Sequence, residues 1–379
     1  MMRPDATLPS AKRIPNKFNL FHNIVFSLSV GLISFVILFY LPILKNSHRL
    51  IAITFFSFII SLSIFLFCYL LYIQKLSYIN QWNLEREQLI KEKIDLKKRK
   101  ITGNLIFTMT ALGDYGNSLF ALTNNSLLKQ IEKADKSITK ISNIPILTTQ
   151  NNMERFSGIF DHFLIRNSAS ISRIASEKQK RLVIIDNINE SYKEIIIEKV
   201  NKILSKNISD QIQFLPPNKL NAFINKQANL QATPSIFLLG IQINTETSYF
   251  SEAIILIELL SNSKEHEPKI HQSPENNLDL CIENVLSFGG NIPYAIENIW
   301  YCNIDEFEIT QILDKLTTLG ISPPPNLVNV NKIFGDTNEL SDLLLISLAL
   351  EQTKKNNLPQ LIINTESMHN ARIISNNHR

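Results

Sequence analysis

Cysteine and histidine are the side chains best suited to covalent chemistry, and both are scarce here. The sequence has three cysteines, Cys68, Cys281 and Cys302, and seven histidines in 379 residues. A thiol beside an imidazole can act as the nucleophile in acyl transfer. Cys302 lies in the apolar run IWYCNI, so we expect a buried structural thiol instead. An odd number of cysteines offers no disulfide framework and suits a reducing compartment.

Two further stretches carry residue types that bind metals or phosphates. His266 and His271 stand five apart beside Glu265 and Glu267 in a polar loop, a spacing that matches no common metal site. The glycine pair in SFGGN (287–291) precedes no helix with the spacing of a phosphate-binding loop. We therefore predict that the histidine-bearing stretch is a solvated loop and that SFGGN is a turn. We predict no catalytic, cofactor-binding or metal-binding residue.

Two apolar runs near the N-terminus predict membrane-spanning helices. Neither residues 18–44 nor residues 50–74 contain Asp, Glu, Lys or Arg, and each run exceeds the roughly 20 residues that a helix needs to cross a bilayer. The first run is also too long for the apolar part of a signal peptide, and no small-residue cleavage site precedes Lys45. We predict a hairpin in the lipid bilayer, spanning residues 18–44 and 50–74, whose two ends lie on the same side.

The basic residues that flank the hairpin predict its orientation. Four precede the first run and eight lie within residues 75–100, against only Lys45 and Arg49 between the runs. Because basic residues favour the cytoplasmic side, we expect both termini in the cytoplasm of a bacterium and the hairpin in its inner membrane. The net charge of +4 is concentrated beside the membrane, which favours lipid contact and gives no indication of nucleic-acid binding.

Two segments beside the hairpin complete the N-terminal part. Residues 1–17 are basic and polar, and we expect them to be disordered. Residues 75–101 contain strong helix formers, with Trp82, Leu89 and Leu96 seven apart. A dimerising coiled coil, a lipid-binding stalk and a solvated connector all remain open for this juxtamembrane helix.

Residues 102–379 alternate between strand and helix patterns, which predicts a cytoplasmic α/β domain. Its first half, about 102–262, is expected to contain a strand from residue 103, helices at 127–141, 152–178 and 190–204, and strands at 181–187, 234–244 and 251–262. A surface loop, 263–277, separates this from the second half, 278–379. That half is expected to contain strands at 298–304, 326–335, 358–366 and 370–375 and helices at 305–320 and 338–352. The similar order predicts two topologically related halves.

The helix expected at 338–352 is apolar almost all round. Apolar residues occupy positions 340, 343–346 and 348–350, so only a narrow polar stripe remains. A helix of this kind must be covered on every side.

The sequence around this helix resembles a known family. GDTNELSDLLLISLAL followed by QLIINTES is similar to the stretch of β-ketoacyl synthases and other thiolase-like proteins in which a Gly-His-Thr turn opens the buried helix of the second half. Gly335 and Thr337 match that turn. The resemblance implies a thiolase-like fold, in which two buried helices lie back to back between two sheets.

The chain departs from the family at the residues that perform its chemistry. Asp336 stands where the family has a catalytic histidine, and a carboxylate would repel a developing oxyanion. The family's nucleophilic cysteine opens the first half's buried helix, but no cysteine occurs between Cys68 and Cys281.

We therefore expect a degenerate, non-catalytic domain that acts as an inner-membrane scaffold through contacts with a protein partner. Whether it also forms a homodimer remains open. This arrangement resembles accessory components of secretion machinery such as the type VI system. The alternative is a membrane-associated enzyme that transfers acyl groups or modifies lipids. A sensor across the bilayer is disfavoured because the hairpin loop is so short.

Overall fold

A computed structural model describes most of the chain. The described residues are 10–15, 19–40, 49–123, 126–132, 138–145, 151–176, 180–204, 206–230, 235–244, 250–261, 267–273, 278–288, 296–321, 325–365 and 370–376. They form two units, Met1–Asp95 and Leu96–Arg379, which are described separately.

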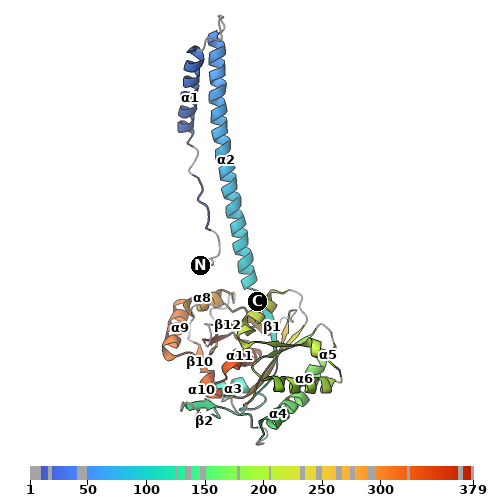
Figure 1. Cartoon of the computed structure of the whole chain (residues 1–379). Coiled ribbons are helices and arrows are strands. Elements are labelled where there is room, and N and C mark those ends of the chain that lie inside the picture. The colour runs from blue at the N-terminus through green and yellow to red at the C-terminus, as the bar shows by residue number, and fades with distance from the viewer. Residues whose placement is uncertain are drawn as a thin grey trace. The chain divides into compact units, whose positions relative to one another are not determined.

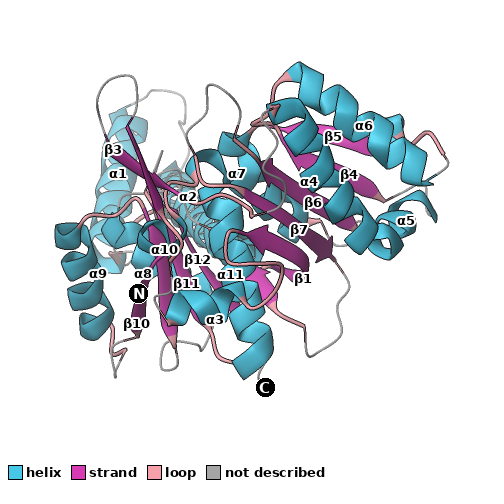
Figure 2. Cartoon of the chain, turned by 90° about the horizontal axis from the view of Figure 1, so that it is seen from below, coloured by secondary structure: helices cyan, strands magenta, loops and turns pink. Residues whose placement is uncertain are grey.

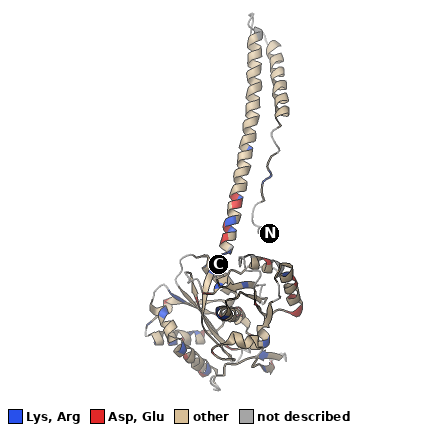
Figure 3. Cartoon of the chain, turned by 180° about the vertical axis from the view of Figure 1, so that it is seen from behind, with Lys and Arg blue, Asp and Glu red and all other residues tan. Residues whose placement is uncertain are grey.

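The first unit consists mainly of two long helices, α1 (Leu20–Tyr40) and α2 (Arg49–Lys97) (Figure 1). Both are long and apolar enough to cross a membrane, as predicted from the two apolar runs. Helix α2 continues without a break through most of the predicted juxtamembrane segment. Between residues 51 and 96, all the charged residues of α2 follow the apolar run (Figure 3).

Small residues bring the two helices of the hairpin together. Ser27 and Gly31 on α1 lie four apart, as do Ser57 and Ser61 on α2. Ser61 Oγ donates a 2.8 Å hydrogen bond to the Ser27 carbonyl. A Cβ added to Gly31 would lie 2.9 Å from Ser61 Cβ. Close packing of small residues is a common way for helices to associate in lipid, where apolar surface alone gives little driving force.

The N-terminal segment contacts α2 beyond the apolar run. The backbone of Lys12 forms two 3.0 Å hydrogen bonds with the Asn83 side chain, and its Nζ lies 4.1 Å and 4.2 Å from the ring centroids of Tyr78 and Trp82. Residues 1–9 and 16–17 of the segment predicted to be disordered lie outside the described residues, and that prediction stays untested.

The second unit is built on a ten-stranded mixed sheet with an internal repeat. The first half contributes β1 (Lys100–Thr110), β4 (Arg181–Ile185), β5 (Ile212–Leu215), β6 (Ile236–Gln242) and β7 (Ala253–Leu260). The second half contributes β8 (Lys269–His271), β9 (Asn298–Cys302), β10 (Asn326–Asn329), β11 (Gln360–Asn364) and β12 (Asn370–Ser375). The spatial order is β10-β9-β11-β12-β8-β1-β7-β6-β4-β5.

If the five strands of each half are numbered along the chain, both halves have the same spatial order. From the outer edge of the sheet to its centre, this order is third, second, fourth, fifth, first. In each half the fifth strand, β7 or β12, runs antiparallel to its two neighbours, while the second, third and fourth are parallel. The two first strands, β1 and β8, pair antiparallel at the centre. The structure confirms the predicted α/β domain of two related halves.

Helices form three layers with the two halves of the sheet between them (Figure 2). The outer face of the first half packs against α4 (Asn152–Arg166), α5 (Ser168–Ser176) and α6 (Glu190–Leu204). The outer face of the second half packs against α8 (Leu278–Phe288) and α9 (Glu306–Thr318). The central layer contains α7 (Leu220–Asn229) and α11 (Ser341–Asn356), and α3 (Asn117–Leu122) packs against α11.

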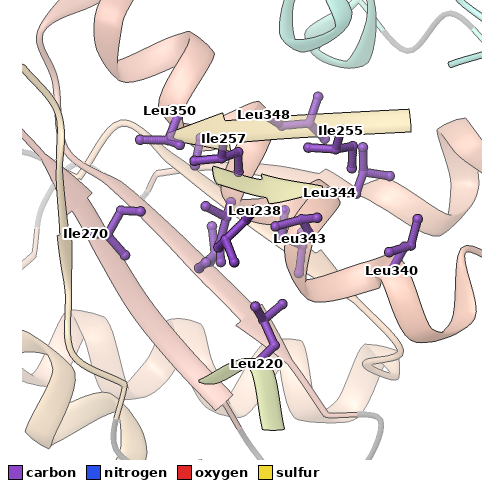
Figure 4. Packing of buried hydrophobic residues seen from close by; sticks show 14 of the residues in the cluster. Leu220, Leu238, Ile255, Ile257, Ile270, Leu340, Leu343, Leu344, Leu348 and Leu350 are labelled. Atoms are coloured by element: carbon purple, nitrogen blue, oxygen red, sulfur yellow. The ribbon is translucent and has the colours of Figure 1, made fainter. Parts of the chain in front are cut away.

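Helix α11 is the buried helix that the sequence predicts. It contacts β1 and β7 of the first half and β9, β11 and β12 of the second. Its residues Leu343–Leu350 are all buried, and Leu343, Leu344 and Leu348 meet Ile255 and Ile257 of β7 in the same cluster (Figure 4). The 3-10 turn η3 (Asn338–Leu340) precedes it.

Three local predictions were wrong. The helix expected at 127–141 is a pair of strands, β2 (Lys129–Glu132) and β3 (Ile138–Ile141). The β-branched residues of β3 suit a strand, and its Lys140 carbonyl accepts a hydrogen bond from the Asp336 N–H. The loop expected at 263–277 contains β8. The strand expected at 326–335 ends at Asn329 and is followed by α10 (Val330–Phe334), which Asn329 caps through the Lys332 N–H.

The β8 prediction failed because two of its three buried residues are polar. Lys269 Nζ donates a 2.8 Å hydrogen bond to Thr102 Oγ1, and His271 Nε2 lies 2.9 Å from Ser375 Oγ. Only neighbouring strands supply these partners. Two further differences concern helices. The helix predicted at 152–178 is divided at Asn167 into α4 and α5. Helices α7 and α8 were not predicted from the sequence.

Candidate functional site

A cleft of about 200 Å³ lies at the carboxyl ends of the parallel strands β4 and β6. Such edges are where open α/β sheets bind ligands. Aromatic side chains line one part of the cleft, namely Phe156, Tyr192 and Phe250. The remaining lining is mostly polar and includes Asn187, Asn189, Gln242, Asn338 and Glu339. The turn that opens α11 therefore forms one wall of the cleft.

Backbone contacts hold this turn in place. Gly335 has a φ of 84°, which favours glycine, and a Cβ there would lie 2.5 Å from the Lys140 carbonyl oxygen. The Asp336 N–H donates to that carbonyl over 3.2 Å, and the Ser251 N–H donates to the Asp336 carbonyl over 2.6 Å. Ser142 Oγ donates a 2.6 Å hydrogen bond to the Phe334 carbonyl. The end of β3 and the start of β7 thus fix the turn from two sides.

Asp336 and Thr337 occupy the positions that the family resemblance singled out. Asp336 Oδ1 accepts a 3.0 Å hydrogen bond from the Asn338 N–H, so the carboxylate caps its own turn. Thr337 is buried, with its Oγ1 3.0 Å from Ser341 Oγ. These side chains stabilise the start of α11, and neither lines the cleft.

The cysteines lie elsewhere. Cys281 is fully buried on α8, and this burial raises the pKa of its thiol to about 12, which disfavours the reactive thiolate. Cys302 is fully buried on β9, as expected for a structural thiol. Cys68 lies within α2. Helix α7 occupies the place of the first half's buried helix, and the residues at its start are Pro216, Pro217, Asn218 and Lys219.

The stretches considered for metal or phosphate binding are described only in part. His271 is a core residue of β8, whereas Glu265 and His266 lie outside the described residues. Ser287 and Phe288 belong to α8, and residues 289–291 are not described. Within the described part of the chain, no group of three or more His, Cys, Asp or Glu residues is placed to hold a metal.

One buried ion pair next to the cleft was not predicted. Arg155, which precedes Phe156 on α4, forms a two-pronged pair with Glu252, with Nη2 2.7 Å from Oε2. The same carboxylate accepts hydrogen bonds from the N–H groups of Ile144 (2.7 Å) and Asn244 (3.0 Å). The sequence feature that could have revealed this pair is Glu252, a charged residue directly before the apolar run AIILI. The pair fixes α4, β7 and the end of β6 around the cleft.

A second buried polar network joins the two halves. Asp342 on α11 is partly buried and accepts 2.7 Å hydrogen bonds from Asn221 on α7 and Asn364 on β11. Asn221 Oδ1 in turn accepts a 3.2 Å hydrogen bond from Arg372, which is 1% exposed on β12. Burial raises the pKa of Asp342, while Asn364, Asn221 and Arg372 oppose the shift. The sequence feature that could have revealed this network was again a charged residue within an apolar run, namely Asp342 and Arg372.

The duplicated strand order, with α7 and α11 between the halves, defines a thiolase-like α/β fold, as the sequence resemblance implied. Comparison with solved structures finds several similar chains at low identity. A β-ketoacyl synthase from Burkholderia phymatum is 9% identical with a TM-score of 0.47, and the match covers 74% of this chain and all of that one. A 3-oxoacyl-(acyl carrier protein) synthase III from Pseudomonas aeruginosa is 9% identical with a TM-score of 0.41, covering 74% and 97%.

A third similar structure is a monomeric SCP2-thiolase like protein from Mycobacterium smegmatis, 7% identical with a TM-score of 0.42, covering 75% and 78% of the two chains. These likenesses concern the fold alone. No family model and no curated protein matches the sequence.

Proposed function

We propose that this chain is a membrane-anchored, thiolase-like binding protein that works through contacts and does not catalyse acyl condensation. The observation that carries the proposal is the use of Asp336 as a turn cap at the start of α11, where the family has a catalytic histidine. A carboxylate at this position cannot stabilise an oxyanion, because like charges repel.

The cysteines support the same proposal. Condensation through a covalent intermediate needs an accessible nucleophile. Cys281 and Cys302 are fully buried, and none of the three cysteines of the sequence lines the cleft.

The two apolar helices support the membrane part of the proposal. We propose that the hairpin lies in a bacterial inner membrane with both termini in the cytoplasm, since the basic residues flank its open end. Tethering the domain to a surface raises its effective concentration for a partner in the same membrane. An accessory role in secretion machinery such as the type VI system would suit this arrangement.

The test uses the full-length protein in lipid nanodiscs, incubated with radiolabelled acyl thioesters. We expect no covalent label on any cysteine and no release of free thiol above a protein-free control. Affinity capture of the full-length chain from its own membranes should retain a defined protein partner. A labelled cysteine, lost on replacement by serine, would favour the alternative of a membrane-associated acyl transferase.

A further inference from the structure

Basic residues gather where the apolar run of α2 ends. The described N-terminal residues 10–15, called the strap below, run alongside α2 (Figure 1). Together with residues 75–84 of α2 they contain three basic residues, Lys12, Arg13 and Lys75, and no acidic residue. Lys75 directly follows the uncharged run. A helix that crosses a bilayer leaves the hydrocarbon at this point and enters the headgroup layer.

The Asn83 side chain holds the strap on α2. Its Oδ1 accepts a 3.0 Å hydrogen bond from the Lys12 N–H, and its Nδ2 donates a 3.0 Å hydrogen bond to the Lys12 carbonyl. One side chain thus satisfies both backbone groups of one strap residue. This contact involves no charge, so it fixes the position of the strap independently of the charges that the strap carries.

The ammonium group of Lys12 lies on two aromatic rings. Its Nζ donates a 2.6 Å hydrogen bond to the Tyr78 hydroxyl and lies 4.1 Å and 4.2 Å from the ring centroids of Tyr78 and Trp82. Aromatic faces attract a cation but do not neutralise its charge. An ammonium also has three donors, of which Tyr78 takes one. The group is therefore held in place with its charge uncancelled.

The other two cations are exposed near the same rings. Lys75 precedes Tyr78 by three residues and Trp82 by seven, so it projects from the same side of α2. Arg13 follows Lys12 in the strap, and the side chains of Arg13 and Lys75 are both exposed. Among the described residues, no ion pair involves any of the three basic residues. Tyr and Trp are typical of the membrane–water interface, where lipid phosphates lie.

We propose that the strap and α2 form a binding site for the headgroup of an anionic phospholipid, with Lys12, Arg13 and Lys75 as its cations. Charge complementarity selects this ligand, because a zwitterionic headgroup brings a cation of its own into a site without a carboxylate. The inference rests on the membrane part of the proposed function. It adds a lipid class that the anchor prefers and assigns the strap a role in that preference.

The test is titration of the full-length protein in a non-ionic detergent with dioleoyl phosphatidylglycerol or dioleoyl phosphatidylcholine, followed by native mass spectrometry. The two lipids have the same acyl chains, so the difference in affinity reports the headgroup. We expect phosphatidylglycerol to bind at least about tenfold more tightly, since each basic residue near an anionic headgroup contributes about fivefold. The preference should shrink as salt is added.

Charge variants identify the cations. Lys12→Gln and Lys75→Gln should each reduce the preference for phosphatidylglycerol about fivefold, and Lys12→Arg should retain it. Lys91→Gln is the matched control. Lys91 is exposed and follows Trp82 by nine residues, which is two and a half helical turns, so it lies on the opposite side of α2. An equal loss in Lys91→Gln would overturn the site in favour of diffuse attraction.

A neutral variant tests the strap itself. Asn83→Ala leaves the net charge unchanged but removes both hydrogen bonds to Lys12, so it should reduce the preference about as much as Lys12→Gln does. Asn80→Ala, at an exposed position of the same helix, should leave the preference unchanged. An unaltered preference in Asn83→Ala would overturn the role of the strap.

Two outcomes separate this inference from the proposed function. Equal affinity of the wild type for the two lipids would overturn only this inference. Extraction of membranes with alkaline carbonate tests the hairpin on which it rests, and the protein should stay in the membrane pellet. Release into the supernatant would overturn the membrane part of the proposed function.

Discussion

Asn221 Nδ2 donates a 2.7 Å hydrogen bond to Asp342 Oδ2 and so joins the two buried helices of the domain, α7 from the first half and α11 from the second. The contact lies within an otherwise apolar layer. Arg372 on β12 donates to the same asparagine, which extends the network to the sheet. The two halves are thus connected by oriented polar groups as well as by apolar packing, and such networks favour one arrangement over others.

The first prediction concerns pH and Asp342. Because the pKa of this carboxyl is raised in the folded state, the folded chain holds the proton more tightly than the unfolded chain does. Its stabilising effect is therefore fully present below the ordinary value of 3.8 and is lost as pH rises toward the raised value. The melting temperature of the wild type, relative to Asp342→Asn, should fall across that window.

Differential scanning calorimetry over a series of acidic buffers gives this comparison. Asp314→Asn, which removes a carboxylate on the exposed face of α9, is the matched control. A wild-type minus Asp342→Asn difference that is constant with pH would contradict the prediction.

The second prediction compares two glycines with positive φ, one of which has room for a Cβ and one of which has not. Gly335 and Gly320 have nearly equal φ values, 84° and 85°, but an added Cβ meets the Lys140 carbonyl and Ser251 Oγ at Gly335 and nothing within 4 Å at Gly320. Gly320→Ala should cost about 1 kcal/mol from strain. Gly335→Ala should cost clearly more, measured by urea denaturation. At Gly335 the ψ of −167° completes a conformation that only glycine adopts readily, and β3 must also move. Equal costs would show that the close approach is unimportant.

The third prediction tests the burial of α11. Leu344 is fully buried between the halves of the sheet, so Leu344→Ala should lower the free energy of unfolding by about 2–5 kcal/mol. Leu319→Ala, at a position that is 38% exposed, should cost much less. Denaturant titrations of both variants measure the difference, and a small effect at Leu344 would mean that this helix is not sandwiched.

The fourth prediction concerns the start of α9. Asp305 accepts a 2.7 Å hydrogen bond from the Glu308 N–H, and Glu308 reaches back to the Asp305 N–H, which completes a capping box. Asp305→Ala should cost about 1 kcal/mol, measured by thermal unfolding. Thr310→Ala, one turn further on, removes no cap and serves as the control. A similar loss in both variants would argue against the cap.

Sequence pattern alone determined much of this protein. The two uncharged runs set the hairpin, because a helix needs a minimum apolar length to cross a bilayer. Residues 340–350 form a helix that is apolar almost all round, so other elements must cover it on every side. This inference led to the thiolase-like fold. The helices expected at 190–204 and 305–320 correspond to α6 and α9.

Tertiary structure decided what local pattern could not. Strand β8 is short and polar at both ends, and it exists because Thr102 and Ser375 on neighbouring strands satisfy Lys269 and His271. The cleft gathers Asn187, Gln242 and Glu339 from segments far apart in the chain, so no spacing in the sequence could reveal it. The Asn221–Asp342 contact could not be predicted for the same reason, because a hydrogen bond depends on distances that only the folded chain sets.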